Sequence, residues 1–227
     1  MRVGAVTGFG VISPRTRREA ELFYADLVGR PPRRVAFPEA DPGAAEATPP
    51  PEWLAIAQRL PVTYARPQPP MEPRILGVVV HTTNHAAGAE TLERFQRDWQ
   101  ALQFQSAHFA VDRAGNIGQY RSTREVAWHI KKPSVRYFGI EHIARHKQEL
   151  TSEQIERSAR LIGYLAVLFS FPATRLAAAG QSGIGIHVDF NPTGCGQNVF
   201  WIGTTSQRTA TFDRLVTRAH DYATLGY

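Results

Sequence analysis

Cysteine occurs only once among the 227 residues of this chain, at Cys195. A single cysteine excludes a disulfide bond within the chain, so disulfide bonds do not hold this fold together. No apolar run approaches the roughly 18 residues that a membrane-spanning helix requires, and we expect no membrane span. The opening residues MRVGAVTGFG are interrupted by glycine and make a poor signal peptide. We therefore expect a cytoplasmic protein, or one that is exported by a route without such a leader.

Acidic side chains are in the minority, with 20 aspartates and glutamates against 26 lysines and arginines, and the formal net charge is +6. Such a balance favours polyanionic partners, which include nucleic acids, anionic lipids and acidic glycan-peptide polymers. The basic residues form no run of five or more, and pairs such as Lys131–Lys132 are short. No nucleic-acid-binding motif is present, so we predict no nucleic-acid partner. A merely solvated basic surface remains the alternative.

Proline is unevenly distributed, because twelve of the sixteen prolines lie between Pro31 and Pro73. This stretch is therefore predicted to form an extended arm. A helix capped by Ser13 is predicted before it, so residues 1–72 are expected to form one helix and a proline-rich arm. The arm is expected to dock on the remaining domain, residues 73–227, or to bind a partner protein. This expectation depends on a short apolar stripe in the arm, made of Trp53, Leu54, Ile56 and Leu60.

Strands and helices alternate from residue 75 onward. The apolar runs at 75–80 and 136–144 are typical of strands buried on both faces, and a hairpin is predicted over 106–121. Helices are predicted from residues 91, 151 and 209, with a capping box of Thr151 and Gln154 in the second. The first is expected to bury Leu92, Phe95, Trp99 and Leu102, and the second Ile155, Ala159, Ile162 and Leu165. The pattern predicts an α/β or α+β domain, with a mixed central sheet flanked by helices.

Side chains that could bind a metal ion follow two of the predicted buried strands. His81 ends the run ILGVVV, His187 ends GIGI, and Cys195 comes eight residues after His187. Two imidazoles and one thiolate suit zinc, and three protein ligands leave a fourth position open, as in catalytic zinc sites. The spacing alone is also compatible with hydrogen-bonded core histidines and with a cysteine that packs as a small apolar side chain.

One carboxylate, Glu141, interrupts the apolar strand YFGIEHIA. Burying a carboxylate is unfavourable unless the group is paired or protonated. One interpretation is an ion pair with an arginine. The other is a general base whose pKa is raised by a dry pocket and which acts on a metal-activated water.

Six segments of the chain occur in the order found in a known family: VVVHTT, SAHFAVDRAGNIGQY, AWH, FGIEH, LTSEQ and HVDFNPTGC. Together they resemble the zinc-dependent N-acetylmuramoyl-L-alanine amidases of the amidase-2 family. That family includes the T7 lysozyme type, the peptidoglycan recognition proteins and the cytosolic muropeptide-recycling amidases. The resemblance spans roughly residues 75–197, does not extend to the first 72 residues, and implies a mixed sheet flanked by helices.

The resemblance implies that His81, His187 and Cys195 bind Zn²⁺ and that Glu141 is the base. The implied reaction is hydrolysis of the amide bond between N-acetylmuramic acid and the L-alanine of the peptidoglycan stem peptide. Zinc-activated water would be the nucleophile, and peptidoglycan or a muropeptide the substrate. Because all these residues follow residue 75, a chain that begins near Met71 is expected to keep the activity.

The resemblance also implies a substrate groove, to which we assign His108, Trp128 and His129, with ordinary core packing as the alternative for Trp128. Ala107 stands where some branches have a tyrosine near the metal, which favours Glu141 as the base. Thr193 stands where several branches have a lysine that can stabilise the oxyanion, so Thr193 is predicted to be a neutral donor there. The residues after Cys195 are Gly-Gln, where the family usually has Pro-Gly.

Two other functions remain open. The first is a non-catalytic module that binds peptidoglycan or muropeptides, although family members without catalysis typically lack the cysteine. The second is a cysteine hydrolase that uses Cys195 and His187, but no helix N-terminus is predicted behind the cysteine to lower its pKa. A phage lysin released by a holin, an antibacterial toxin delivered by a secretion machine and a cytosolic recycling enzyme all agree with the sequence.

Overall fold

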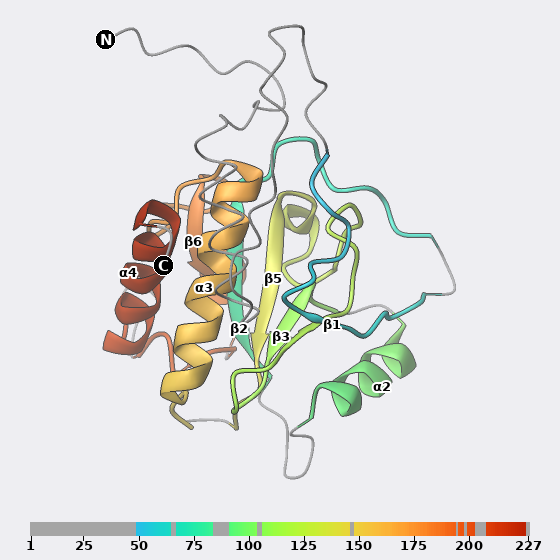
Figure 1. The fold of residues 1–227 in the computed structure, drawn as a ribbon, viewed down its shortest axis with the longest axis horizontal. Helices are drawn as coiled ribbons and strands as arrows, with labels where there is room; N and C mark the ends of the chain where they lie inside the picture. The colour runs from blue at the N-terminus through green and yellow to red at the C-terminus, as the bar shows by residue number, and fades with distance from the viewer. Residues whose placement is uncertain are drawn as a thin grey trace, which may run out of the picture.

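The computed structural model describes residues 49–64, 67–83, 91–103, 106–145, 148–193, 195–197, 199–202 and 208–225. The helix predicted to begin at Ser13 lies outside these residues. Within them, a six-stranded mixed sheet has the strand order β1-β4-β3-β5-β2-β6, with helices packed against it (Figure 1). The predicted fold class is therefore confirmed. Among the described residues, no helix has the length and apolar character needed to cross a membrane.

The strands are short, and most of them run in parallel. They are β1 (Gln58–Arg59), β2 (Gly77–Thr82), β3 (Phe109–Val111), β4 (Ile117–Gln119), β5 (Tyr137–His142) and β6 (Gly183–Ile186). β3 and β4 form an antiparallel hairpin, while β2 pairs in parallel with β5 and β6, and β3 pairs in parallel with β5. The carboxyl ends of β2, β3, β5 and β6 therefore lie at the same end of the sheet.

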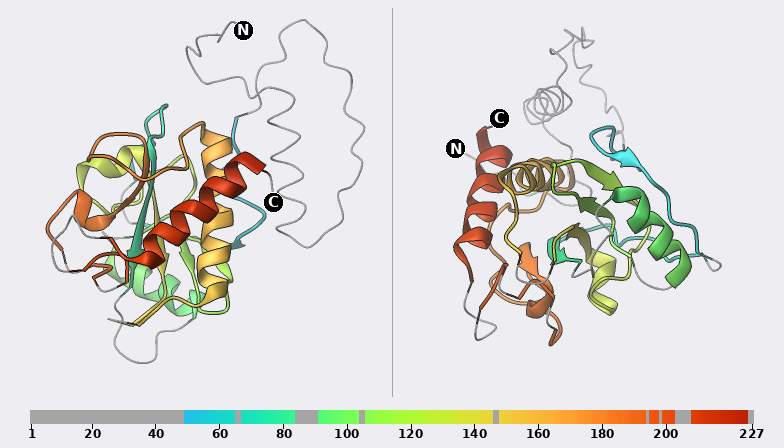
Figure 2. Two further views of the ribbon diagram at one scale, coloured as in Figure 1. Left: turned by 90° about the vertical axis from the view of Figure 1, so that its left-hand side faces the viewer. Right: turned by 90° about the horizontal axis from the view of Figure 1, so that it is seen from below.

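Helices cover the two faces of the sheet unequally. α3 (Ser152–Phe169) and α4 (Ala210–Leu225) pack together over one face, and α2 (Leu92–Leu102) lies on the other (Figure 2). The predicted capping box of Thr151 and Gln154 is present, and the predicted stripe of α3 is buried. The prediction for Leu102 is wrong, because this residue ends α2 and is 44% exposed.

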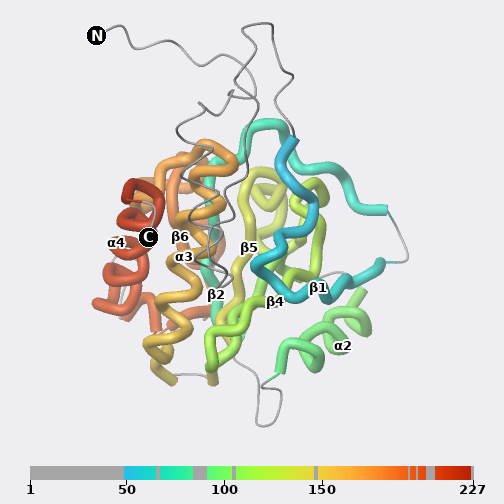
Figure 3. Tube along the Cα trace, viewed as in Figure 1, coloured from blue at the N-terminus to red at the C-terminus, as the bar shows by residue number. Residues whose placement is uncertain are grey.

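The described part of the arm packs against the domain. β1 pairs with β4 at the edge of the sheet, and the tube in Figure 3 follows this segment in blue. Leu54 joins the main core, and Leu60, Val62 and Tyr64 pack with the buried face of α2. The apolar stripe therefore docks through Leu54 and Leu60, and Ile56 is partly buried against the main core. Whether residues 1–72 and 73–227 are separable units stays a prediction, but these contacts favour a folding unit that begins before Leu54.

The contacts of the arm revise the expectation that a chain beginning near Met71 keeps the activity. Such a chain is expected to fold poorly, because it lacks the buried side chains of Leu54, Leu60, Val62 and Tyr64. Burying each large apolar side chain contributes about 1.5–3 kcal/mol, and a whole domain is stable by only about 5–15 kcal/mol. A chain that begins at Pro49 keeps every described contact and is the matched control. Thermal unfolding followed by circular dichroism compares the two. Equal melting temperatures would contradict this expectation.

Candidate metal centre

The strand register brings the predicted metal ligands together. His81 is the fifth residue of β2 and lies opposite Glu141 of β5. On the other side of β2, Val80 is paired with Ile186, the last residue of β6, so His187 follows next to His81. His187 opens the short 3-10 helix η2 (His187–Asp189), and the following loop returns Cys195 to the end of β2.

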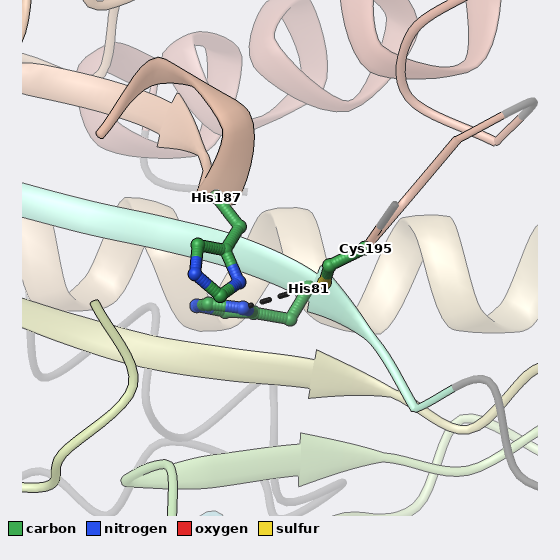
Figure 4. Close-up of side chains that lie close together, drawn as sticks. All are labelled: His81, His187 and Cys195. Atoms are coloured by element: carbon green, nitrogen blue, oxygen red, sulfur yellow. Dashed lines mark hydrogen bonds between the residues drawn. The ribbon is translucent and has the colours of Figure 1, made fainter. Parts of the chain in front are cut away.

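The three side chains point toward one another (Figure 4). One ligand atom from each of His81, His187 and Cys195 lies within 4.8 Å of the others. The distance from Cys195 Sγ to His81 Nδ1 is 3.6 Å. Tetrahedral zinc with ordinary Zn–N and Zn–S bonds separates such a nitrogen and sulfur by about 3.6 Å. The donor set and its spacing therefore fit zinc, and the cluster offers three candidate protein ligands among the residues that the structure describes.

Hydrogen bonds determine which nitrogen of His81 carries its proton. The carbonyl oxygen of Tyr137 can only accept, so His129 Nε2, 3.0 Å away, must donate to it. Burial lowers the pKa of His129 to about 3, so its ring is neutral and its Nδ1 is an acceptor. His81 Nε2 lies 2.9 Å from that Nδ1 and therefore donates to it. Burial also lowers the pKa of His81, which leaves its Nδ1 unprotonated and facing the cluster.

The backbone is shaped to seat the ring of His129. A Cβ atom at Gly139 would lie 2.7 Å from His129 Cγ, which is closer than real side chains approach. Ser134 Oγ accepts hydrogen bonds from the backbone N–H groups of His129 and Ile130. The glycine of the FGIEH segment thus leaves room for the imidazole that orients His81.

Replacing His129 with phenylalanine is expected to weaken zinc affinity by roughly 10–100-fold, the usual effect of losing a hydrogen bond that orients a ligand. Competition with a coloured chelator measures the affinity. His129→Asn can place an acceptor near the position of Nδ1 and should recover part of the loss. His108→Phe is the matched control, because it also removes two hydrogen bonds of a buried imidazole without touching His81. Equal affinities in the His129→Phe and wild-type proteins would contradict the assignment.

The loop that carries Cys195 is fixed to the end of β2. Thr82 supplies its carbonyl oxygen to the thiol and its hydroxyl oxygen to the N–H of Gly196. Trp201 Nε1 donates to the Cys195 carbonyl, and the Cys195 N–H donates to Thr193 Oγ1. Gly196 has a φ of 74°, a conformation that favours glycine, which explains this residue after the cysteine. Thr193 therefore shapes the loop and keeps its own hydroxyl proton for donation.

The Cys195 thiol is not activated as a nucleophile in the metal-free protein. Burial, followed by the nearby charge of Glu141, raises its pKa far above the usual value. A nucleophilic cysteine requires the opposite shift. A cation at the cluster would favour the thiolate, so the environment of Cys195 suits a metal ligand better than a cysteine hydrolase.

Glu141 lies beside the cluster without joining it. Its Oε1 is 4.0 Å from His81 Nδ1, its side chain is 13% exposed, and it is not part of the three-residue ligand group. Its Oε2 is buried and has no hydrogen-bond partner among the described residues. Burial raises the pKa of Glu141 to about 8. A carboxyl group with an unused oxygen and a raised pKa is suited to accept and return a proton.

The residues assigned to the substrate groove occupy different positions. His108 is fully buried, accepts from the Gly139 N–H at Nδ1 and donates from Nε2 to the Glu125 carbonyl. Since His129 is also buried with both ring nitrogens engaged, neither imidazole offers a nitrogen to a substrate. Trp128 is half-buried, and its indole N–H donates to Gln68 of the arm. Of these three residues, only Trp128 has a partly exposed side chain that a substrate could contact.

One ion pair near the cluster was not predicted from the sequence. Asp189 accepts from the Ile186 N–H and pairs with Arg208, which precedes α4. It therefore fixes the turn that begins with His187. Asp189 and Arg208 are nineteen positions apart, and no sequence signal would have indicated this contact.

A surface cavity of about 400 Å³ lies away from these residues. It opens between the arm, the start of α2 and the β3–β4 turn, and its lining includes Ile56, Gln58, Thr91, Asp112, Asn116 and Arg157. None of the predicted site residues contributes to it. We place the candidate site at the histidine–cysteine cluster, because that is where the metal-binding and proton-accepting groups converge.

Comparison with known proteins identifies the family of the chain and supports its fold. A family model described as N-acetylmuramoyl-L-alanine amidase matches residues 71–195, more than half of the chain. The chain therefore belongs to the N-acetylmuramoyl-L-alanine amidase family, as its sequence segments predicted. No match was found among the curated proteins.

Solved structures share the fold at low sequence identity. The Staphylococcus aureus hydrolase AmiA, in complex with its ligand, is 13% identical and covers 73% of this chain and 82% of its own, with a TM-score of 0.53. A selenomethionine derivative of AmpD is 19% identical and covers 75% of this chain and 98% of its own, with a TM-score of 0.51. These likenesses support the fold assignment.

Proposed function

We propose that this protein is a zinc-dependent N-acetylmuramoyl-L-alanine amidase that cleaves the bond between N-acetylmuramic acid and the L-alanine of the stem peptide. The observation that carries the proposal is the cluster of His81, His187 and Cys195 with Glu141 beside it. Its position inside the matched segment of the amidase family supports peptidoglycan or a muropeptide as the substrate.

The proposed mechanism assigns a separate task to each side chain. When bound, zinc would supply a Lewis acid for the scissile carbonyl and a water whose pKa is lowered toward about 7. His81, His187 and Cys195 hold the ion, and His129 keeps His81 in the tautomer that presents Nδ1. Glu141 takes a proton from the attacking water and returns it to the departing amine of L-alanine. The Thr193 hydroxyl can donate to the developing oxyanion.

The charge of Glu141 depends on its surroundings. In the metal-free protein, its raised pKa keeps much of this carboxyl protonated at pH 7. A cation held by the neighbouring cluster lowers the pKa of a carboxyl group and favours the carboxylate that a general base requires. Metal binding is therefore coupled to the ionisation of Glu141 in this site.

The test is a digest of purified peptidoglycan analysed by mass spectrometry. The expected products are stem peptides with a free L-alanine amine and glycans that retain the lactyl carboxylate. A chelator should stop the reaction, and added zinc should restore it. Cleavage within the glycan or at another peptide bond would contradict the proposal. Tight binding of muropeptides without any turnover would support the non-catalytic recognition module instead.

A further inference from the structure

A fully buried imidazole, that of His142, lies at the end of β5 on the face that α3 covers. Successive side chains of a strand point to opposite faces of the sheet. His142 therefore points toward α3, whereas its neighbour Glu141 points toward His81 and the candidate metal centre. His142 has no task in the proposed mechanism, yet its ring contacts the supports of two candidate ligands.

Both ring nitrogens of His142 have hydrogen-bond partners. The carbonyl oxygen of His81 lies 3.0 Å from Nδ1 and can only accept, so Nδ1 donates to it. Nε2 lies 2.8 Å from the hydroxyl oxygen of Ser158 in α3. The ring is thus held between the backbone of a candidate ligand and a helix of the core. His142 fixes the backbone of His81, while His129 orients its imidazole.

The same ring supports the loop of Cys195. The rings of His142 and Phe200 meet edge to face, with centroids 5.3 Å apart. Phe200 closes the turn after the cysteine, because its N–H donates to the Gly196 carbonyl over 2.8 Å. A Cβ atom at Gly196 would lie 3.0 Å from Phe200 Cδ2, so the ring and the turn are in close contact. His142 therefore contacts the backbone of His81 on one side and the support of Cys195 on the other.

We propose that His142 is a positioning residue that holds His81 and Cys195 at the spacing a metal ion requires, before the ion binds. This inference rests on the metal-binding part of the proposed function. Ligands that are already in place lose less conformational entropy on binding, so the site binds its ion more tightly. Loss of His142 should therefore weaken metal binding beyond its effect on the stability of the fold.

The first test compares two substitutions that each remove a buried ring from β5. His142→Leu should weaken zinc affinity at least about 10-fold, the lower end of the usual loss when a residue that supports a ligand is replaced. His142→Asn can donate to the His81 carbonyl from Nδ2 and should recover part of the loss. Phe138→Leu is the matched control, because Phe138 is also fully buried on this face of β5 and its ring packs on Phe109 and Phe169.

Competition with a chelator measures the affinity, and chemical denaturation of the metal-free proteins measures stability. Both leucine variants should be less stable than the wild type, but only His142→Leu should bind zinc more weakly. Ser158→Ala removes one partner of the ring, should weaken binding to a smaller extent, and replaces the leucine variant if that protein does not fold. Wild-type affinity in these variants, or an equal loss of affinity in Phe138→Leu, would overturn the inference.

The second test needs no metal ion. Cys195 carries the only thiol of the chain, so its rate of alkylation reports how often its loop opens. Without the ring that supports Phe200, His142→Leu should be alkylated at least about 5-fold faster than the wild type and Phe138→Leu. If the wild-type protein binds no zinc, the proposed function fails, and this rate still decides the role of His142. Faster alkylation in His142→Leu alone supports the role, and equal rates in the three proteins refute it.

Discussion

The Cys195→Ser protein, purified without added metal, is expected to contain almost no zinc. Serine is nearly isosteric but remains an un-ionised hydroxyl at neutral pH, so the site loses its anionic ligand. We expect zinc affinity to fall by at least about 100-fold, more than for a residue that only orients a ligand. Elemental analysis should give one zinc ion per wild-type chain. A serine variant that retains a full zinc ion would show that the ligand assignment is wrong.

Cys195→Asp provides the control for this experiment. Aspartate is the third ligand in some branches of the resembled family, so this variant should recover part of the affinity. The pH dependence distinguishes the two proteins. The raised pKa of the Cys195 thiol means that zinc must displace its proton, so wild-type affinity should rise about tenfold per pH unit across the neutral range. The aspartate variant should lose this contribution and keep only the dependence below about pH 8 that comes from the proton of Glu141.

Glu141→Gln is expected to retain zinc and to lower the hydrolysis rate by roughly 10² or more, the usual contribution of a proton-transfer group. Glutamine keeps the shape of glutamate but cannot accept the proton of the attacking water. Parallel measurements of zinc content and turnover of a muropeptide test this directly. Near-normal turnover in the variant would remove Glu141 from the mechanism. A loss of zinc would instead make Glu141 a ligand.

The same substitution should alter stability in the metal-free protein. The pKa of Glu141 is raised from 4.5 to about 8, so the native state holds a proton that the unfolded chain releases between these values. Stability present at low pH is therefore lost as the pH rises from 4.5 to 8. Glu141→Gln has no such group and should become more stable than the wild type above pH 8, by on the order of 5 kcal/mol. Chemical denaturation at pH 4 and pH 9 measures the difference.

The sequence predicted where the candidate ligands lie because they follow strongly patterned segments. His81 ends a continuous apolar run, and the capping box at Thr151 fixed the start of α3, so strand and helix positions could be read directly. His81, His187 and Cys195 then come close together because parallel pairing brings the carboxyl ends of their strands to the same end of the sheet. That pairing is a long-range property, and the sequence indicated it only through the family resemblance.

Other features depend on tertiary contacts that leave no local pattern. The AWH segment suggested a groove wall, but the depth of His129 depends on the space above Gly139. The pairing of Asp189 with Arg208 joins two loops whose charges look unremarkable in the sequence. The positive φ of 63° at Lys131 was likewise not predicted from the sequence, because residues other than glycine seldom adopt it. Each of these required the positions of residues distant along the chain.

The placement of β1 also has a consequence for self-association. An uncovered edge strand exposes backbone N–H and C=O groups that can pair with another chain and seed aggregation. Here the edge beside β4 is occupied by a strand of only two residues that includes Arg59, and on the opposite edge Ile184 of β6 forms a bridge with Arg175. Short strands and arginines discourage intermolecular pairing at both edges. A chain without the arm would expose the backbone of β4 and should form β-rich oligomers as its concentration rises.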